Sequence, residues 1–356
     1  MKTINVTLTN DDIMEKNKDR GGLAMEQTKK CPSCGGTMIF NPGFDSLMCQ
    51  SCGHTEIIPE LVSRVPVEEM DFLTAQNTAS HDWGMEAKVV QCKQCGAQTI
   101  QNKLQLSGMC PFCGSTTVDA ADPAQDIMAP QGIIPFKITE KRAYYIFKDW
   151  IKDRFLAPEK LATNAQLGKF YGIYVPMYTF DVFTDSRLNA YYVENNRRQY
   201  TSAIFQYQVD DFPVVASKQL ASDRLLLSVL KDYRTNEAKP YTPDAMAGFP
   251  CEHYSIGLRD AWNNCGPELN WHLRDQVDKA DKAHFLMGIN MNTNYYNLKY
   301  KYLIVPVWIN SFFYDNRLFT IVINGQTGKI DGQWPKSFGT FAKKTALLFL
   351  GSFGFD

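Results

Sequence analysis

Two Cys-x2-Cys pairs separated by fourteen residues occur twice in this chain, and this arrangement constrains the fold more than any other feature. The first copy runs from Cys31 to Cys52 and the second from Cys92 to Cys113. Each copy is too short to bury enough apolar surface to offset the chain entropy lost on folding. A structural metal ion is therefore expected to hold each copy together.

Zinc is the metal that these cysteines favour, because it binds four thiolates in a tetrahedron. A glycine follows the second cysteine of every pair, and glycine tolerates the left-handed backbone that closes such a turn. The short strand-like runs between the pairs indicate zinc ribbons. We expect two zinc ions per chain, and the eight predicted ligands are Cys31, Cys34, Cys49, Cys52, Cys92, Cys95, Cys110 and Cys113.

The N-terminal sequence is polar and lacks the apolar core of a signal peptide, so we expect a cytoplasmic protein. Paired cysteines in a reducing compartment indicate metal binding rather than disulfides. The 356 residues carry a formal net charge of −1, which gives no general attraction to nucleic acid or anionic lipid.

Four cysteines at each site leave no open coordination position for a catalytic water, which predicts a structural role for zinc. His54 directly follows Cys52, and we expect it to be a surface residue rather than a ligand. The ribbons carry mixed charges and no basic aromatic surface. This favours a protein-binding adaptor, and a nucleic-acid-binding accessory factor of replication or transcription is the alternative.

No nucleotide-binding or catalytic motif stands out, and we predict that the protein is not an enzyme. Cys251 and His253 leave two other hypotheses open: a nucleophile and its base, or a third metal site with Cys265 and His272. The structural alternative is that Cys251 is a small core residue. The run from Asn195 to Tyr200 is expected to be a solvated hairpin tip.

The chain divides into segments of different composition, and an α+β fold is expected for the largest. The predicted segments are a disordered tail at 1–24, zinc ribbon 1 at 25–60, a helical linker at 61–87, zinc ribbon 2 at 88–120, a linker at 121–131, an α+β domain at 132–340 and a short apolar segment at 341–356.

Within the α+β domain, a strand is expected from Gly132, followed by a helix with Thr139 as its N-cap and Pro158 beyond its end. Alternating aromatic and β-branched residues over 171–193 predict a hairpin. The stretch 302–332 predicts a meander that ends in a turn at 324–328.

These two strand-rich stretches match each other when shifted by 130 residues without a gap. Matched pairs include Val175 with Val305, Pro176 with Pro306, Phe183 with Phe313, Asp185 with Asp315, Arg187 with Arg317, and Leu188 with Leu318. The match predicts a duplicated helix-plus-hairpin unit, and similar hairpin composition without duplication is the alternative. The two prolines are expected at an edge or bulge, because proline cannot donate to the ladder.

The two ribbons, "YVPMYTFDV", "AGFPCEHYSI" and the block from Ile304 to Ser337 together resemble a bacterial double zinc-ribbon family. Members are labelled TFIIB-type zinc ribbon-containing or replication restart helicase PriA-like proteins. The resemblance covers roughly 28–340 and implies zinc ligation by the eight cysteines. It also implies partners in membrane-stress systems of the phage-shock type. The chain shows no helicase motor motif.

The C-terminal segment places Lys343 and Lys344 before an apolar run too short to span a bilayer. Two interpretations stay open: the stump of a membrane anchor, or a helix that packs on the domain or lies on a membrane surface. We expect protein partners. A contact of this segment with a membrane surface stays an open alternative. The sequence does not determine the oligomeric state.

Overall fold

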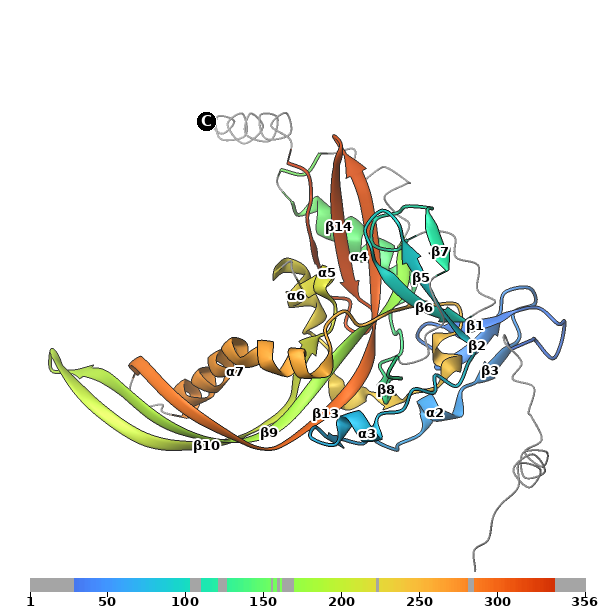
Figure 1. The fold of residues 1–356 in the computed structure, drawn as a ribbon. Helices are drawn as coiled ribbons and strands as arrows, with labels where there is room; N and C mark the ends of the chain where they lie inside the picture. Colours follow the sequence, from blue (N-terminus) through green and yellow to red (C-terminus); the bar gives the residue numbers. More distant parts are fainter. Residues whose placement is uncertain are drawn as a thin grey trace, which may run out of the picture.

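The structure is a computed structural model, and it describes residues 29–102, 110–120, 127–154, 156–158, 161, 170–221, 224–280 and 285–336. The tail predicted at 1–24 and the apolar segment at 341–356 lie outside these ranges. The architecture is α+β and mostly strand, which confirms the predicted fold class. Figure 1 shows long curved strands with helix α7 on their concave side.

Three long antiparallel strands form the centre of the molecule. The strands are β9 (Tyr171–Glu194), β10 (Arg197–Val215) and β13 (Met287–Tyr314). Strand β9 lies in the middle and pairs with both neighbours, and β14 (Arg317–Asn324) continues the sheet beyond β13.

Two tight turns connect these strands, and both need residues that accept a positive φ. Asn195 and Asn196 have φ values of 49° and 62°, and Asp315 and Asn316 have 47° and 58°. Positive φ at both central residues is the geometry of a two-residue hairpin turn that matches strand twist. The expected hairpin tip at Asn195 and the predicted meander are therefore confirmed.

The hairpin predicted within 171–193 is wrong, because β9 is one continuous strand through that region. Side chains there keep a period of two: Thr184 and Ser186 are buried, whereas Phe183 and Arg187 are exposed. The Ser186 hydroxyl lies 2.8 Å from that of Thr293 on β13. A cross-strand partner thus satisfies the polar group that suggested a turn.

Helix α7 (Leu258–Ala280) packs on β10 and β9 through one stripe of buried residues at four-residue spacing. Helix α4 (Glu140–Lys152) begins after Thr139, whose Oγ1 accepts a hydrogen bond from the Arg142 N–H at 3.2 Å. This is the N-cap that the sequence predicts. The short helices α5 (Lys218–Ala221), α6 (Arg224–Leu230), η3 (Thr235–Glu237) and η4 (Pro243–Met246) lie between β10 and α7 in the chain.

The two ribbons relate differently to the large sheet. In the first, β1 (Met38–Asn41), β2 (Ser46–Cys49) and β3 (Thr55–Ile57) form a separate three-stranded sheet. The second contains β5 (Ala87–Cys92), β6 (Gln98–Asn102) and β7 (Val118–Ala120). Strand β6 pairs with β12 (Cys251–Glu252), and β12 pairs with β9, so ribbon 2 extends the large sheet.

The segment predicted as a helical linker forms only single helical turns and a short strand. These elements are α2 (Pro59–Val62), β4 (Met70–Asp71) and α3 (Ala75–Thr78). The helix prediction is wrong at β4 because Met70 and Asp71 pair with Tyr300 and Lys299 of β13. Tertiary strand pairing outweighs the local helical pattern there. The predicted domain boundaries themselves stay predictions.

Short strands complete the sheet around β13 and β14. The strand expected from Gly132 is β8 (Gly132–Ile133), which pairs with β13 and with β11 (Lys239–Pro240), and β15 (Ile330–Gly332) pairs with β14. Pro176 lies just beyond the β9–β10 ladder, which stops at Met177. Pro306 lies between the positions of β13 that pair with β8 and with β14. Both prolines lie inside the β9–β13 ladder rather than at the expected edge or bulge, but the ladders on the other side of each strand do not include them, so no donor is needed there.

Candidate metal centres

All four Cys-x2-Cys-Gly turns close in the same way. In each turn the glycine N–H donates to the carbonyl of the first cysteine, and the N–H of that cysteine donates to the carbonyl five residues later. The glycines adopt φ values of 71°, 75°, 75° and 73°, a region that glycine enters without steric cost. The glycine pattern therefore correctly predicted these turns at Gly35, Gly53, Gly96 and Gly114.

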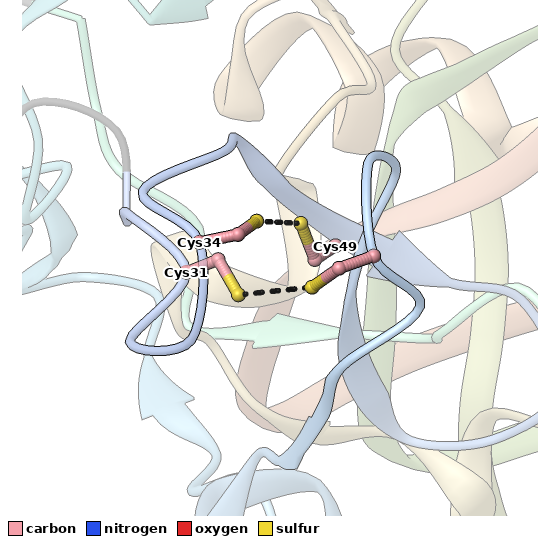
Figure 2. A group of neighbouring side chains, drawn as sticks. Cys31, Cys34 and Cys49 are labelled. Atoms are coloured by element: carbon pink, nitrogen blue, oxygen red, sulfur yellow. Dashed lines mark hydrogen bonds between the residues drawn. The ribbon is translucent and has the colours of Figure 1, made fainter.

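The sulfur atoms of the first ribbon come together from its two turns, as Figure 2 shows. Cys31 Sγ lies 3.5 Å from Cys52 Sγ, and Cys34 Sγ lies 3.5 Å from Cys49 Sγ. All four Sγ atoms lie within 4.8 Å of one another. A zinc ion with Zn–S bonds of about 2.3 Å needs sulfurs roughly 3.8 Å apart, so the cluster fits zinc.

The second ribbon repeats this geometry. Cys92 Sγ lies 3.6 Å from Cys113 Sγ, and Cys95 Sγ lies 3.6 Å from Cys110 Sγ. All eight cysteines are free thiols, and these separations are far longer than the roughly 2.05 Å of a disulfide. The eight residues predicted from spacing thus form two four-cysteine clusters that suit two zinc ions.

The local backbone prepares one thiol in each cluster for ionisation. Backbone N–H groups of Cys52 and Ser51 lower the pKa of the Cys49 thiol to about 6. Burial opposes ionisation of Cys92, but the N–H groups of Cys95 and Gln94 still lower the pKa of its thiol to about 7.

Another thiol resists ionisation. Burial raises the pKa of Cys95 to about 11. Four thiolates this close repel one another, and a divalent cation removes that repulsion. Zinc binding should therefore release protons from both clusters.

His54 lies beside the first cluster but is not part of it. Its Nδ1 lies 3.2 Å from the hydroxyl of Ser33, so the ring connects one turn of the ribbon to the other. Within the described residues, the group of metal-ligating atoms around Cys31 contains four cysteines and no histidine. This agrees with the expectation that His54 is not a ligand.

Cys251 and His253 each contact other groups, which does not favour the hypothesis of a nucleophile and its base. Cys251 is fully buried in β12, and its Sγ donates to the carbonyl of Glu252 at 3.3 Å. Burial raises the pKa of this thiol and lowers that of His253. The His253 ring stacks on Tyr254 with centroids 4.8 Å apart. The thiol is therefore placed as a protonated core group.

The alternative of a third metal site with Cys265 and His272 is also not supported. Cys265 Sγ donates to the carbonyl of Trp262 at 3.1 Å, and His272 packs against Tyr207 and Phe212. Over the described ranges, none of the groups able to hold a metal includes Cys251, His253, Cys265 or His272.

Sequence reasoning missed a cluster of carboxylates formed by Glu69, Asp181 and Asp210. The three residues come from the segment before β4, from β9 and from β10, so no local spacing brings them together. The adjacent acidic residues Asp210 and Asp211 inside an apolar strand pattern were the one signal available.

Sequence comparison finds a similar protein in Bacillus subtilis. The chain is 27% identical over 338 residues to the protein described as "Uncharacterized protein YdjG" of Bacillus subtilis (strain 168), covering 91% of this chain and 94% of that protein. No protein-family model matches the chain, and no solved structure matches it. In the described residues, the helices are all too short or too polar to cross a membrane.

Proposed function

We propose that this protein binds two structural zinc ions and is a non-enzymatic adaptor, in which the zinc ions rigidify ribbons that bind a partner protein. The four cysteines around each metal position favour a structural role, because they leave no position for water or substrate. The protonated and buried state of Cys251 also favours a role without nucleophilic catalysis.

The observation that carries this proposal is the exposed apolar surface of ribbon 1. Met38, Phe40 and Leu47 of this ribbon are buried. Ile57 is 65% exposed, however, and Val62 of helix α2, which directly follows the ribbon, is 58% exposed. Ile57 belongs to β3, which pairs with β2 at the edge of the ribbon sheet. An exposed edge strand that carries an apolar side chain is a surface that partner proteins can use for strand addition.

The test compares capture of partner proteins by three forms of the full chain. The Ile57→Lys/Val62→Lys form alters the exposed edge while leaving all eight cysteines in place. The control, Val193→Lys, changes a residue that is 52% exposed on β9. The adaptor proposal expects one protein that the wild type and the control bind directly after purification and that the ribbon variant loses. Equal binding by all three forms would show that ribbon 1 is not the docking surface.

The alternative function, a nucleic-acid-binding accessory factor, is favoured by the tip of the β9–β10 hairpin. Arg197 and Arg198 are exposed there, and Tyr200 is 77% exposed. The Arg198 guanidinium lies 4.9 Å from the centre of the Tyr191 ring. Arginines beside aromatic rings suit phosphates and unpaired bases.

Fluorescence anisotropy with single-stranded DNA and RNA separates these two functions. The adaptor function expects no binding at moderate salt. Binding that weakens steeply with salt, and that is lost in Arg197→Ala/Arg198→Ala, would favour the accessory factor. We further propose a cytoplasmic location and a partner in a membrane-stress system, both of which rest on the resemblance to the double zinc-ribbon family.

A further inference from the structure

Three carboxylates converge where the segment between the ribbons meets the long strands. Glu69 precedes β4, Asp181 lies in β9 and Asp210 lies in β10. One oxygen atom from each of these side chains lies within 4.8 Å of the other two.

Irregularities in both strands beside β9 create this convergence. On one side, Asp210 and Asp211 form a β-bulge between Val209 and Phe212, opposite Asp181. On the other side, the register of β13 shifts between Tyr296 and Lys299. Asp211 adopts a φ of 50°, so the backbone leaves its regular path at this point. Bulges commonly redirect side chains next to functional sites.

The surroundings of the Asp181 carboxylate point to a bound ligand. Asp181 is only 6% exposed. One of its carboxylate oxygens accepts a hydrogen bond from the Asp211 N–H at 3.0 Å. The other oxygen, Oδ2, is buried and has no hydrogen-bond partner among the described residues. A buried carboxylate oxygen without a partner is costly, so a bound cation would stabilise it.

The charges around Asp181 favour the binding of such a cation. Lys301 Nζ lies 2.7 Å from Asp211 and 3.6 Å from Glu69. Lys299 Nζ lies 3.2 Å from Glu69. The four carboxylates of Glu69, Asp181, Asp210 and Asp211 face these two ammonium groups, so the cluster retains two negative charges when all groups are ionised.

We propose that Glu69, Asp181 and Asp210 bind a hard divalent cation of the Ca²⁺ or Mg²⁺ type. Carboxylate oxygens select these ions, whereas the thiolate clusters select zinc. The ion would connect the segment between the two ribbons to both long strands of the hairpin. This site is separate from the zinc ribbons and does not depend on the adaptor function.

A proton shared between Asp181 and Asp210 is the competing explanation, because it would also relieve the buried oxygen. Calorimetric titration of the zinc-loaded full chain with CaCl₂, and separately with MgCl₂, distinguishes the two. We expect saturable binding of one equivalent of at least one ion, together with a rise in the thermal midpoint. An absence of binding of both ions would overturn the proposal.

Three variants locate the site. Asp181→Asn keeps the shape of the side chain and should weaken binding by about tenfold or more. Asp210→Asn changes an exposed ligand and should weaken binding even if the buried variant fails to fold. Asp185→Asn is the matched control, since it removes one charge from the same face of β9 about 13 Å away. Equal affinity in all three variants would show that the ion binds elsewhere and would overturn the proposal.

Lys301→Met tests the site through an expected gain, rather than a loss, of affinity for the ion. Its ammonium group competes with a cation for Asp211 and Glu69, so its removal should tighten ion binding. Weaker ion binding in this variant would contradict the proposed electrostatics.

Discussion

Val175 and Val305 are direct register partners on the antiparallel strands β9 and β13, and both are fully buried. Their neighbours pair symmetrically around them, Pro176 with Ile304 and Pro306 with Tyr174. The two valines are also matched by the 130-residue shift within the sequence. The centre of the sheet is thus locally two-fold symmetric, which is compatible with a duplicated unit.

The match does not extend to the hairpin ends. Asp315 lies in the β13–β14 turn, whereas its counterpart Asp185 lies within β9, which continues to Glu194. Duplication of the whole helix-plus-hairpin unit therefore stays a prediction.

Truncation of either valine of the symmetric pair should lower the stability of the fold by a similar amount. We expect Val175→Ala and Val305→Ala each to lower the free energy of unfolding by about 2 kcal/mol, because each leaves a cavity in a packed core. The double variant should deviate from additivity, since the side chains are neighbours. Urea denaturation measures these values, and Val193→Ala at an exposed position is the control. A loss on only one strand would contradict the symmetric packing.

The two cysteine clusters were predictable from sequence because each turn depends on neighbouring residues alone. A Cys-x2-Cys-Gly turn closes with its own backbone, as at Cys31 and Gly35, so spacing alone predicted the eight cysteines that form the clusters. The continuous course of β9 and the strand β4 were not predictable in this way. Both depend on pairing with β13, for the most part more than a hundred residues away, and such pairing can override turn and helix patterns. The carboxylate cluster at Asp181 depends on the same long-range pairing.

Metal analysis should give about two equivalents of zinc per chain. Cys49→Ser and Cys110→Ser should each reduce the content to about one equivalent, because each cluster loses one of four ligands. Inductively coupled plasma mass spectrometry of purified protein measures this. Cys265→Ser, which changes a cysteine outside both clusters, is the matched control and should retain two. Iron–sulfur absorption, or one equivalent in the wild type, would refute the assignment.

Loss of the first zinc should also disturb the large domain. Phe40 of ribbon 1 belongs to the same core as Phe249, with ring centroids 6.4 Å apart, and its N–H donates to the carbonyl of Ala247 at 2.9 Å. We therefore expect Cys49→Ser to increase amide hydrogen exchange around Phe249. The local spacing of the cysteines alone predicts that each ribbon is a module of its own. Unchanged exchange around Phe249 would show that ribbon 1 unfolds independently.

Glu252 should make stability depend on pH. It is 3% exposed, and burial raises the pKa of its carboxyl to about 8, although a 2.6 Å hydrogen bond from Ser217 opposes that shift. The unfolded carboxyl titrates near an ordinary pKa of about 4.3. Between these values the native state holds a proton that the unfolded state has lost. Rising pH therefore favours unfolding, by at most about 1.4 kcal/mol per pH unit.

The Glu252→Gln variant measures this contribution directly. The amide keeps the shape and the acceptor for Ser217 but does not titrate, so the unfolding free energy of wild type minus variant should fall from about pH 5 to pH 8. Above the folded pKa the difference should become constant, because both states are then ionised. Urea denaturation of zinc-loaded protein at several pH values measures the slope. Glu140→Gln removes a charge from an exposed position and should retain the wild-type slope. A wild-type minus Glu252→Gln difference that stays constant over this range would show that Glu252 is ionised in the folded protein.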